Sequence, residues 1–528
     1  MVKDTLRDIR SSKEIIVSAD KSPILCKVPV NMYKKILREE ATKKYKVSSK
    51  NSVNLVNQES LQFVERYEPG LETRVEIFSQ PEGFFTFKDH KQGFPSKFEV
   101  RLINPAKPQT GKITQKKLQE INSNLRTLTK LNQLQSTKDA ITWFESIKGK
   151  KRRYFLGFDI KSFYPNITER ILKNALSWAR SLIKITKADE NLIFMARRSF
   201  LFIEGRSWVK KENSTFDVTM GAFDGAEVAE FIGIFILDKL SSIMKISDFA
   251  LYRDDGIIAL EGTKRTVDET RKKIEQIFKE IGFQVDIPPT GLVKSIDFLD
   301  VTFNLNTGIY APYRKPMNKP IFIHKDSNHP KVIKTEVPCN TEKRLSNNSS
   351  NQKTFDNAKP PYIDALKNSR FSNVDLKFQP SDKKNTKVNT RKVIYCNLPW
   401  NMEVKTNIGK EFLSLVDMFK NFPQAKYINR HIVKLSYSTM RNLKSHIAAS
   451  NFKKLRPKQS SSPEQDCNCM KQNIVCPVNG KCKTDNVVYE TTVKTKHSVK
   501  SYIGMTSRPF IDMERAQGKY ETQKSKGH

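Results

Sequence analysis

Two short apolar runs separated by two acids stand out in the pattern of hydrophobic and polar positions. The stretch ALYRDDGIIAL places apolar residues at 250–251 and 257–260, with Asp254 and Asp255 between them. Short apolar runs bounded by turn residues predict buried strands, so we expect a hairpin with the two acids at its turn. An acidic turn at the edge of a core can bind cations. The alternative is a solvated turn, because Asp-Gly is a common hairpin connection.

Another acid follows an apolar run further upstream. In YFLGFDIKSFYPNI, residues 154–158 predict a strand that ends at Asp159. An acid at the end of one strand can face an acidic hairpin on a neighbouring strand. Two metal ions roughly 3.5–4 Å apart need several carboxylates around them, and they can activate a 3′-hydroxyl and stabilise a leaving pyrophosphate. We therefore predict that Asp159, Asp254 and Asp255 are catalytic and bind two Mg²⁺ ions.

The other periodic segments predict mostly helices. Apolar residues at helical spacing predict helices over residues 32–46, within 113–147, over about 226–244, and around 274–281. Residues 299–305 instead alternate apolar and polar side chains. This alternation predicts a half-buried strand that ends in a turn at residues 306–308.

Composition adds a strong positive charge to this picture. The 528 residues include 93 Lys and Arg against 56 Asp and Glu, a formal net charge of +37. Such an excess along the whole chain indicates a polyanionic partner, because each neutralised phosphate releases counterions. The alternatives are a soluble basic protein and a protein that binds acidic membranes. Apolar runs are shorter than the about 20 residues of a membrane-spanning helix, so we expect no membrane partner.

Four of the seven cysteines cluster behind a linker. Residues 455–466 are rich in Pro and Ser with almost no apolar content, which is typical of a linker. The charged N-terminus is unlike a signal peptide, so we expect an intracellular protein whose cysteines are reduced. The spacing C-x-C-x6-C-x5-C then predicts a tetrahedral Zn²⁺ site, with unliganded thiols as the alternative. Its ligands are Cys467, Cys469, Cys476 and Cys482.

The two acidic stretches resemble motifs A and C of reverse transcriptases, with YRDD (252–255) as the catalytic box. FKDHKQGFPSKFEVRLINPAKPQTGKI, DVTMGAFDGAEVAEFIGIFILDKL, FLDVTFNLNTGIYAPYRKP and HKDSNHP together resemble the reading frame of Penelope-like retroelements, from about Ile15 to beyond Phe510. The resemblance implies an α+β right-hand polymerase fold of fingers, palm and thumb. It further implies an RNA template, a DNA primer and deoxynucleoside triphosphates as partners, and a nuclear location. It says nothing about the oligomeric state.

The resemblance also assigns residues that bind the nucleotide. Lys88 and Arg101 match cations on the fingers hairpin that grip the triphosphate, and Gly221 matches the turn before the helix that supports template base and nucleotide. Tyr164, the fifth residue after Asp159, matches the ring that excludes a 2′-hydroxyl. The alternative is that Tyr164 is a core aromatic. Three lysines near residue 279 are equally suited to act as the general acid toward pyrophosphate: Lys272, Lys273 and Lys279.

The predicted division of the chain has six parts. They are a basic lead-in (1–65), fingers and palm (66–330), a helical thumb-like region (331–454), the linker (455–466), a cysteine-rich zinc knuckle (467–485) and a shortened GIY-YIG endonuclease domain (486–528). Family members carry more sequence before this lead-in, so we expect an upstream RNA-binding segment to be missing. His324 and His329 have no third ligand nearby in the sequence, and we expect them to be structural.

The last part resembles GIY-YIG endonucleases in two predicted strands, VVYETTV and SYIGMT. Tyr489, Tyr502 and Gly504 stand at matching positions. The family places an arginine and a histidine where this chain has Met513 and Gln517, and its metal-binding glutamate lies well downstream. We therefore expect no nuclease activity from this part.

The sequence leaves two functions from different classes. The leading one is an RNA-directed DNA polymerase with a two-metal site. The alternative is a non-catalytic nucleic-acid-binding remnant of a decayed element. A primer-extension assay separates the two.

Overall fold

The structure of the chain is a computed structural model. It describes residues 2–67, 81–379, 393–455, 487–494 and 499–506, without 21, 23, 50–51, 90–92, 109, 212–214, 289–292, 316–318, 373, 405–406, 420, 424–427, 431 and 440–441. The fold mixes helices with sheets, as expected, and all its sheets except the β15–β16 pair are antiparallel within the described residues. Two compact units comprise residues 1–448 and 449–528.

A four-stranded antiparallel sheet lies at the centre of the first unit. Its strand order is β11-β6-β10-β9. Apolar residues on both faces of β6 and β10 explain why these runs form central strands rather than an exposed hairpin. The bounds are β6 Arg153–Ile160, β9 Phe249–Tyr252, β10 Asp255–Glu261 and β11 Val285–Asp286.

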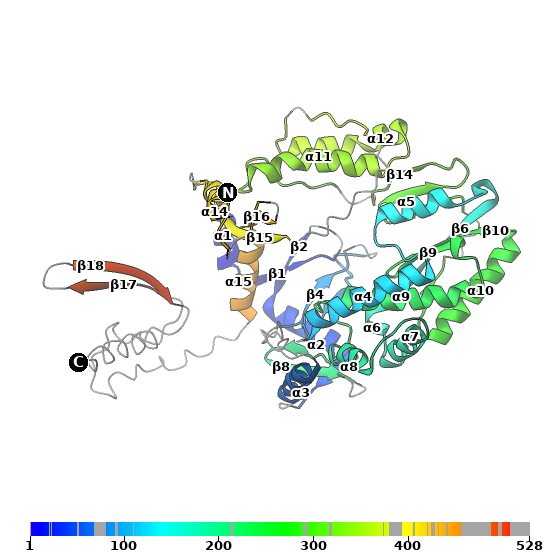
Figure 1. Ribbon diagram of the computed structural model, residues 1–528, viewed down its shortest axis with the longest axis horizontal. Helices are drawn as coiled ribbons and strands as arrows, with labels where there is room; N and C mark the ends of the chain where they lie inside the picture. The colour runs from blue at the N-terminus through cyan, green and yellow to red at the C-terminus, as the bar shows by residue number, and fades with distance from the viewer. Residues whose placement is uncertain are drawn as a thin grey trace. The chain divides into compact units, whose positions relative to one another are not determined.

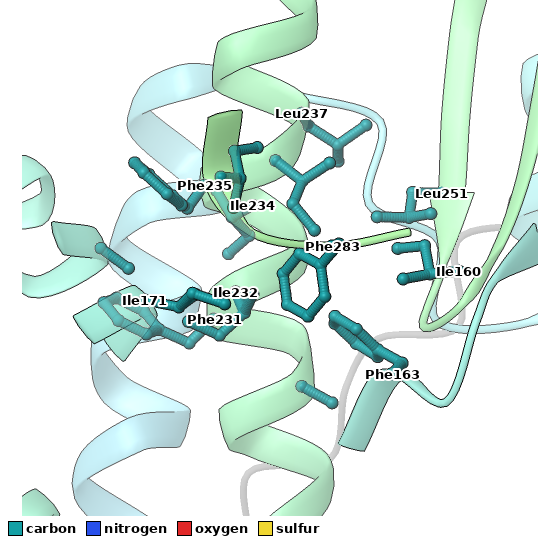
Figure 2. Packing of buried hydrophobic residues seen from close by; sticks show 14 of the residues in the cluster. Ile160, Phe163, Ile171, Phe231, Ile232, Ile234, Phe235, Leu237, Leu251 and Phe283 are labelled. Carbon is teal, nitrogen blue, oxygen red and sulfur yellow. The ribbon is translucent and has the colours of Figure 1, made fainter. Parts of the chain in front are cut away.

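Helices cover one face of this sheet. The helix α9 is the most buried of them, and α4, α7 and α10 pack against it (Figure 1). Figure 2 shows Phe163 and Phe283 between α9 and the strand residues Ile160 and Leu251, with the two ring centroids 5.3 Å apart. The bounds are α4 Gly111–Thr129, α6 Phe163–Asn166, α7 Glu169–Leu182, α8 Lys187–Met195, α9 Gly225–Ser241 and α10 Lys264–Ile281.

The opposite face carries a second core beneath one helix and a three-stranded sheet. Phe144 of α5 packs on Phe303 of β13, with ring centroids 4.7 Å apart. The strand β13 begins at Val301, whereas the alternation predicted a start at Leu299. Leu299 has a φ of 55° and lies in the turn that joins β12 to β13. The bounds are α5 Thr137–Ser146, β12 Ser295–Phe298, β13 Val301–Asn304 and β14 Tyr310–Pro312.

Most elements before residue 111 pair with one another or with later segments. The strand β4 forms a hairpin with β5, and β3 joins β8 and β7 in a separate sheet. Ala19, just after β1, bridges to Phe87 of β4. The bounds are α1 Val2–Ser11, β1 Glu14–Ser18, β2 Leu25–Pro29, α2 Val30–Lys44, β3 Tyr45–Val47, α3 Ser52–Tyr67, β4 Phe84–Phe87, β5 Val100–Ile103, β7 Leu201–Ile203 and β8 Arg206–Lys210.

Residues 331–455 contain strands as well as the predicted helices. Two strands, β15 and β16, pair in parallel, and α14 connects them. Parallel neighbours need such a crossover connection. The bounds are α11 Lys331–Asn347, α12 Gln352–Ala358, α13 Pro360–Asn368, β15 Ile394–Trp400, α14 Ile408–Phe419, β16 Val433–Thr439 and α15 Leu443–Leu455.

In the second unit the structure describes one hairpin. β17 (Val487–Lys494) and β18 (Val499–Thr506) pair antiparallel, which confirms the two strands predicted there. Figure 1 draws this hairpin in red. Across all described ranges, the helices are too short or too polar to cross a membrane.

Candidate active site

Three aspartates lie side by side across the end of the central sheet. Asp159 of β6 pairs with Asp255 of β10 on one side and with Asp286 of β11 on the other. Tyr252 of β9 continues the row next to Asp255. Residues directly opposite each other on antiparallel strands point to the same face, with Cα atoms about 4.5–5.5 Å apart. The row therefore presents three carboxylates, all on exposed residues, at one edge of one face.

This row lies on the face that the large helices leave uncovered. Side chains alternate along β6, so Phe158 belongs to the core beneath α9, and Phe155, with the same alternation as Asp159, belongs to the opposite core. The strand β12 covers this opposite face next to the aspartates, because a Cβ at Gly157 would lie 2.9 Å from the side chain of Ile296. The aspartates thus stand at the open end of a face that β12 otherwise closes.

The hairpin turn is displaced by one residue from the predicted one. Tyr252 pairs with Asp255, so the turn consists of Arg253 and Asp254, and Asp255 already belongs to β10. Arg253 has a φ of 55°, which fits a tight two-residue turn. The turn is tied to β6, because the Ile160 N–H donates to the Asp254 carbonyl at 3.0 Å.

Gly256 has a packing role rather than a turn role. It pairs with Phe158, and a Cβ at Gly256 would overlap the Phe158 ring. The Asp-Gly pair is therefore no solvated turn, because the glycine lies inside β10 and makes room for an aromatic ring. The sequence could not separate these two interpretations, since both predict glycine at this position.

Tyr164 lies within electrostatic reach of the same turn. It belongs to α6, which follows β6 after Ser162, a residue with a φ of 50°. Burial raises the pKa of the Tyr164 phenol, the Arg253 guanidinium lowers it, and the Asp254 carboxylate raises it. The ring also packs against the core beneath α9. Both roles weighed from the sequence, core aromatic and neighbour of the nucleotide, fit this position.

The carboxylates match magnesium in chemistry but are not gathered into a complete ligand set. Within the described residues, no three side chains of the His, Cys, Asp and Glu type lie close enough together to hold one metal ion. Mg²⁺ ordinarily takes one or two carboxylates from the protein and completes its shell with water and substrate phosphates. The exposed pair of Asp159 and Asp255 fits that demand without a third protein ligand.

The two predicted triphosphate cations lie on the β4–β5 hairpin and face acids. Lys88 Nζ lies 3.2 Å from Glu99 Oε2, and Arg101 Nη2 lies 3.4 Å from Asp20 Oδ2. Both cations are partly exposed. Ion pairs between exposed side chains contribute about 0–1 kcal/mol, so a phosphate group can replace either acid at low cost.

Gly221 ties the strand that carries Arg101 to the start of α9. Its N–H donates to the Asn104 carbonyl at 3.3 Å, and a Cβ at this position would overlap the Pro105 backbone. The sequence predicted a close approach of the backbone to a ligand. The close neighbour in the structure is the backbone of Pro105.

A buried ion pair that the sequence did not indicate fixes the same helix start. Arg197 and Asp224, the residue before α9, are both fully buried and form an ion pair. Burial raises the pKa of Asp224, and Arg197 opposes that rise. An arginine and an aspartate 27 residues apart carry no pattern that could predict such a pair.

Asp286 is the other residue missed from the sequence. It ends the short strand in GFQVDI, and only the pairing of β11 with β6 brings it beside Asp159. A two-residue strand leaves no periodic signal. An acid at the end of an apolar run, the signal used for Asp159, was the only indication in the sequence.

The predicted sites of the second unit lie largely outside the description. Cys467, Cys469, Cys476 and Cys482 belong to residues that the structure does not describe, as do Met513 and Gln517. Among the GIY-YIG positions, the backbone of Tyr489 pairs with Gly504 in the β17–β18 hairpin, and Tyr502 pairs with Thr491.

The two histidines of the first unit make local hydrogen bonds. His324 Nδ1 accepts from the Asp326 N–H, and His329 Nδ1 shares a hydrogen bond with the Ser327 hydroxyl.

Comparison with known proteins gives distant structural similarities. No protein-family model matches the chain, and no curated protein matches it. The chain is similar to apo telomerase from Candida tropicalis, with 13% identity and a TM-score of 0.43, over 70% of this chain and 67% of that one. It is also similar to the telomerase of Candida albicans in complex with a fragment of telomeric RNA. The identity is 11% and the TM-score 0.44, over 70% of this chain and 64% of that one.

A viral enzyme shows a weaker similarity. The RNA-dependent RNA polymerase of a human picobirnavirus is 10% identical with a TM-score of 0.32, over 58% of this chain and 62% of that one. The chain thus spans about two thirds of each of these proteins or less. Similarities with TM-scores below 0.5 carry no argument about activity, so the function has to be argued from the residues of this chain.

Proposed function

We propose that this chain is an RNA-directed DNA polymerase of the Penelope-like type. The observation that carries the proposal is the pairing of Asp159 with Asp255 at the open end of the sheet, with Asp254 in the adjoining turn. Carboxylates on neighbouring strands suit a two-metal nucleotidyl transfer. In that reaction the primer 3′-oxygen bonds to the α-phosphorus of a deoxynucleoside triphosphate, the bond from this phosphorus to the bridging oxygen breaks, and pyrophosphate leaves.

Other predicted residues would supply binding and orientation. Two Mg²⁺ ions bound by Asp159, Asp254 and Asp255 would lower the pKa of the 3′-hydroxyl and offset charge on the pyrophosphate. Lys88 and Arg101 would exchange their acid partners for the triphosphate, where the guanidinium offers a bidentate fork. The ring of Tyr164, beside the Arg253–Asp254 turn, would contact the sugar and select deoxynucleotides.

Two further elements would hold the nucleic acid. The β12–β14 sheet borders the aspartate row and would support the primer end. It is joined to α11 by the ion pair of Arg344 with Asp300 at 2.9 Å, which supports a thumb role for α11 to α13. A protein that primes on chromosomal DNA would work in the nucleus.

Primer extension on an RNA template with Mg²⁺ tests the proposal. We expect the wild-type chain to extend a DNA primer with deoxynucleotides, and Asp159→Asn or Asp254→Asn to abolish extension while RNA binding stays within about twofold. The matched control is Asp375→Asn, an exposed aspartate in the thumb-like region. Extension at the wild-type rate by either site variant would refute the metal assignment. RNA binding without any extension by the wild-type chain would favour the non-catalytic alternative.

A further inference from the structure

Two lysines share one aromatic ring next to the start of α9. Lys107 Nζ lies 5.2 Å from the ring centroid of Phe223, and Lys112 Nζ lies 4.8 Å from the same centroid. The two nitrogens are therefore at most 10 Å apart, the sum of these distances. Both lysines are exposed. Like charges at such a separation repel, and the negative face of the ring offsets part of that repulsion.

Three chain segments hold this arrangement in place. Phe223 abuts the first residue of α4, since a Cβ at Gly111 would lie 3.6 Å from the Phe223 side chain. The turn before Phe223 is fixed because the Thr219 hydroxyl donates to the Ala106 carbonyl at 2.8 Å. Lys107 follows Ala106 directly, and Lys112 is the second residue of α4. These contacts fix the backbone positions from which both side chains reach the ring.

We infer that Lys107, Lys112 and Phe223 form a binding site for the backbone phosphates of the unpaired template strand. The inference rests on the proposed polymerase function. Ammonium groups bind phosphates as point charges, and the two lysine nitrogens lie close enough together to contact neighbouring phosphates of one strand. The ring acts by ordering the two cations before the strand arrives.

The position of the site favours the template over the other ligands. The triphosphate is assigned to Lys88 and Arg101 on the β4–β5 hairpin, and the primer end to the β12–β14 sheet. The lysine pair belongs instead to the segment that leads from β5 past the Gly221 contact into α4. In a polymerisation complex, the strand that remains for this surface is the single-stranded template ahead of the nucleotide.

Binding measurements on the full chain without Mg²⁺ or nucleotide test the site. The probes are a fluorescent primer–template with a single-stranded 5′ RNA overhang and a blunt duplex of the same paired length. We expect the double variant Lys107→Gln/Lys112→Gln to bind the overhang probe about tenfold more weakly, with a salt slope of log Kobs smaller by about 1.4. Its affinity for the blunt duplex should stay unchanged.

The matched control is Lys173→Gln/Lys239→Gln, which removes two exposed lysines that lie over other rings, Phe194 and Phe235. It should bind both probes like the wild type. Phe223→Leu retains both charges and should lose part of the overhang affinity. Unchanged overhang binding by the lysine variant would overturn the site even if the chain extends primers, and equal losses on both probes would overturn the template assignment. Overhang-specific loss in a chain that never extends a primer would instead overturn the proposed function and leave the site standing.

Discussion

At the scale of single residues, the aspartate row has an electrostatic cost that the free protein has to bear. Asp159 stands between Asp255 and Asp286 on adjacent strands. Like charges directly opposite on a sheet destabilise it by about 0.2–1 kcal/mol per pair. Side chains that weaken the fold where they stand are typical of functional sites. A cation bound at the row would remove this cost.

The stability of the protein should therefore respond to magnesium through this row. We expect Mg²⁺ to raise the free energy of unfolding of the wild-type chain in urea. Without Mg²⁺, Asp286→Asn loses one repulsive pair and should be more stable than the wild type by about 0.2–1 kcal/mol. Asp159→Asn loses two such pairs and should gain up to about twice as much. With Mg²⁺, Asp159→Asn should gain least. Asp375→Asn serves as the control, and an equal magnesium response in all four proteins would rule out ion binding at the row.

The position of Tyr164 predicts an effect on sugar choice. Tyr164 interacts electrostatically with Arg253 and Asp254 of the hairpin turn, and Tyr164→Ala replaces its ring by a methyl group. We expect the ratio of kcat/KM for ribonucleotides to that for deoxynucleotides to rise by about tenfold or more, since a packed ring that excludes one hydroxyl is worth roughly 1–3 kcal/mol. The control is Tyr164→Phe, which keeps the ring and should leave the ratio unchanged. Phe163→Ala would not serve, because Phe163 is buried and its loss would disturb the core. An unchanged ratio in Tyr164→Ala would move the sugar contact elsewhere.

At the scale of elements, apolar runs in the sequence predicted the strands and helices whose side chains form the core. Apolar runs and 3.6-residue periods predicted the strands β6, β9 and β10 and the helices α9 and α10. Each of these elements buries residues that lie close together in the sequence, so the pattern is visible there. The pairing of Asp286 with Asp159 was not predictable, since strand order is a property of the sheet and not of one segment. The parallel strands β15 and β16 were missed because Val433 is the only buried one among their described residues, so they leave no buried pattern.

The residues of the candidate site likewise fall into those that the sequence could predict and those that it could not. Asp159, Asp254 and Asp255 were found because acids interrupt apolar strands. The acid that faces Arg101 could not be found, because Asp20 lies about 80 residues from its partner and nothing local marks it. The contact of Gly221 with Pro105 was equally hidden, since a glycine shows only that something is near and not what.

The central hairpin predicts a steep cost for a single methyl group. In Gly256→Ala the new Cβ would overlap the Phe158 ring, and overpacking of this kind costs about 1–3 kcal/mol. We expect that loss in the free energy of unfolding, measured by urea titration, together with a marked loss of primer extension. Gly111→Ala is the control, because its Cβ would make ordinary contacts at 3.6 Å. Equal stability of the two variants would mean that the ring can move aside.

At the scale of the whole molecule, the net charge of +37 makes nucleic-acid binding independent of the aspartates. The division into two units makes the cysteine cluster independent of them as well. Basic residues occur along the entire chain, so nucleic-acid affinity should fall steeply with salt and survive loss of the aspartates. The boundary between the units at residue 448 precedes all four clustered cysteines. Changes at those cysteines should therefore leave the aspartate row undisturbed.

Metal analysis tests that separation. Protein purified under reducing conditions should contain about one Zn²⁺ per chain, because four thiolates complete a tetrahedral site. Cys476→Ala should lose the zinc and gain protease sensitivity in the second unit, whereas primer extension stays at the wild-type rate. Cys339→Ala, an exposed cysteine of the first unit, is the control. Wild-type protein without zinc would show that the cysteines are unliganded thiols.

The fit between Gly256 and Phe158 also restricts how the chain can fold. A slip of β10 by one residue along β6 would bring Asp255 or Ile257 opposite Phe158, and it would turn every side chain of the strand to the other face. Neither residue leaves room for the ring. The alignment that places glycine there also places Asp255 beside Asp159, so the fit of the ring over glycine disfavours misaligned hairpins. A residue without any reactive group thus selects the register in which the reactive ones meet.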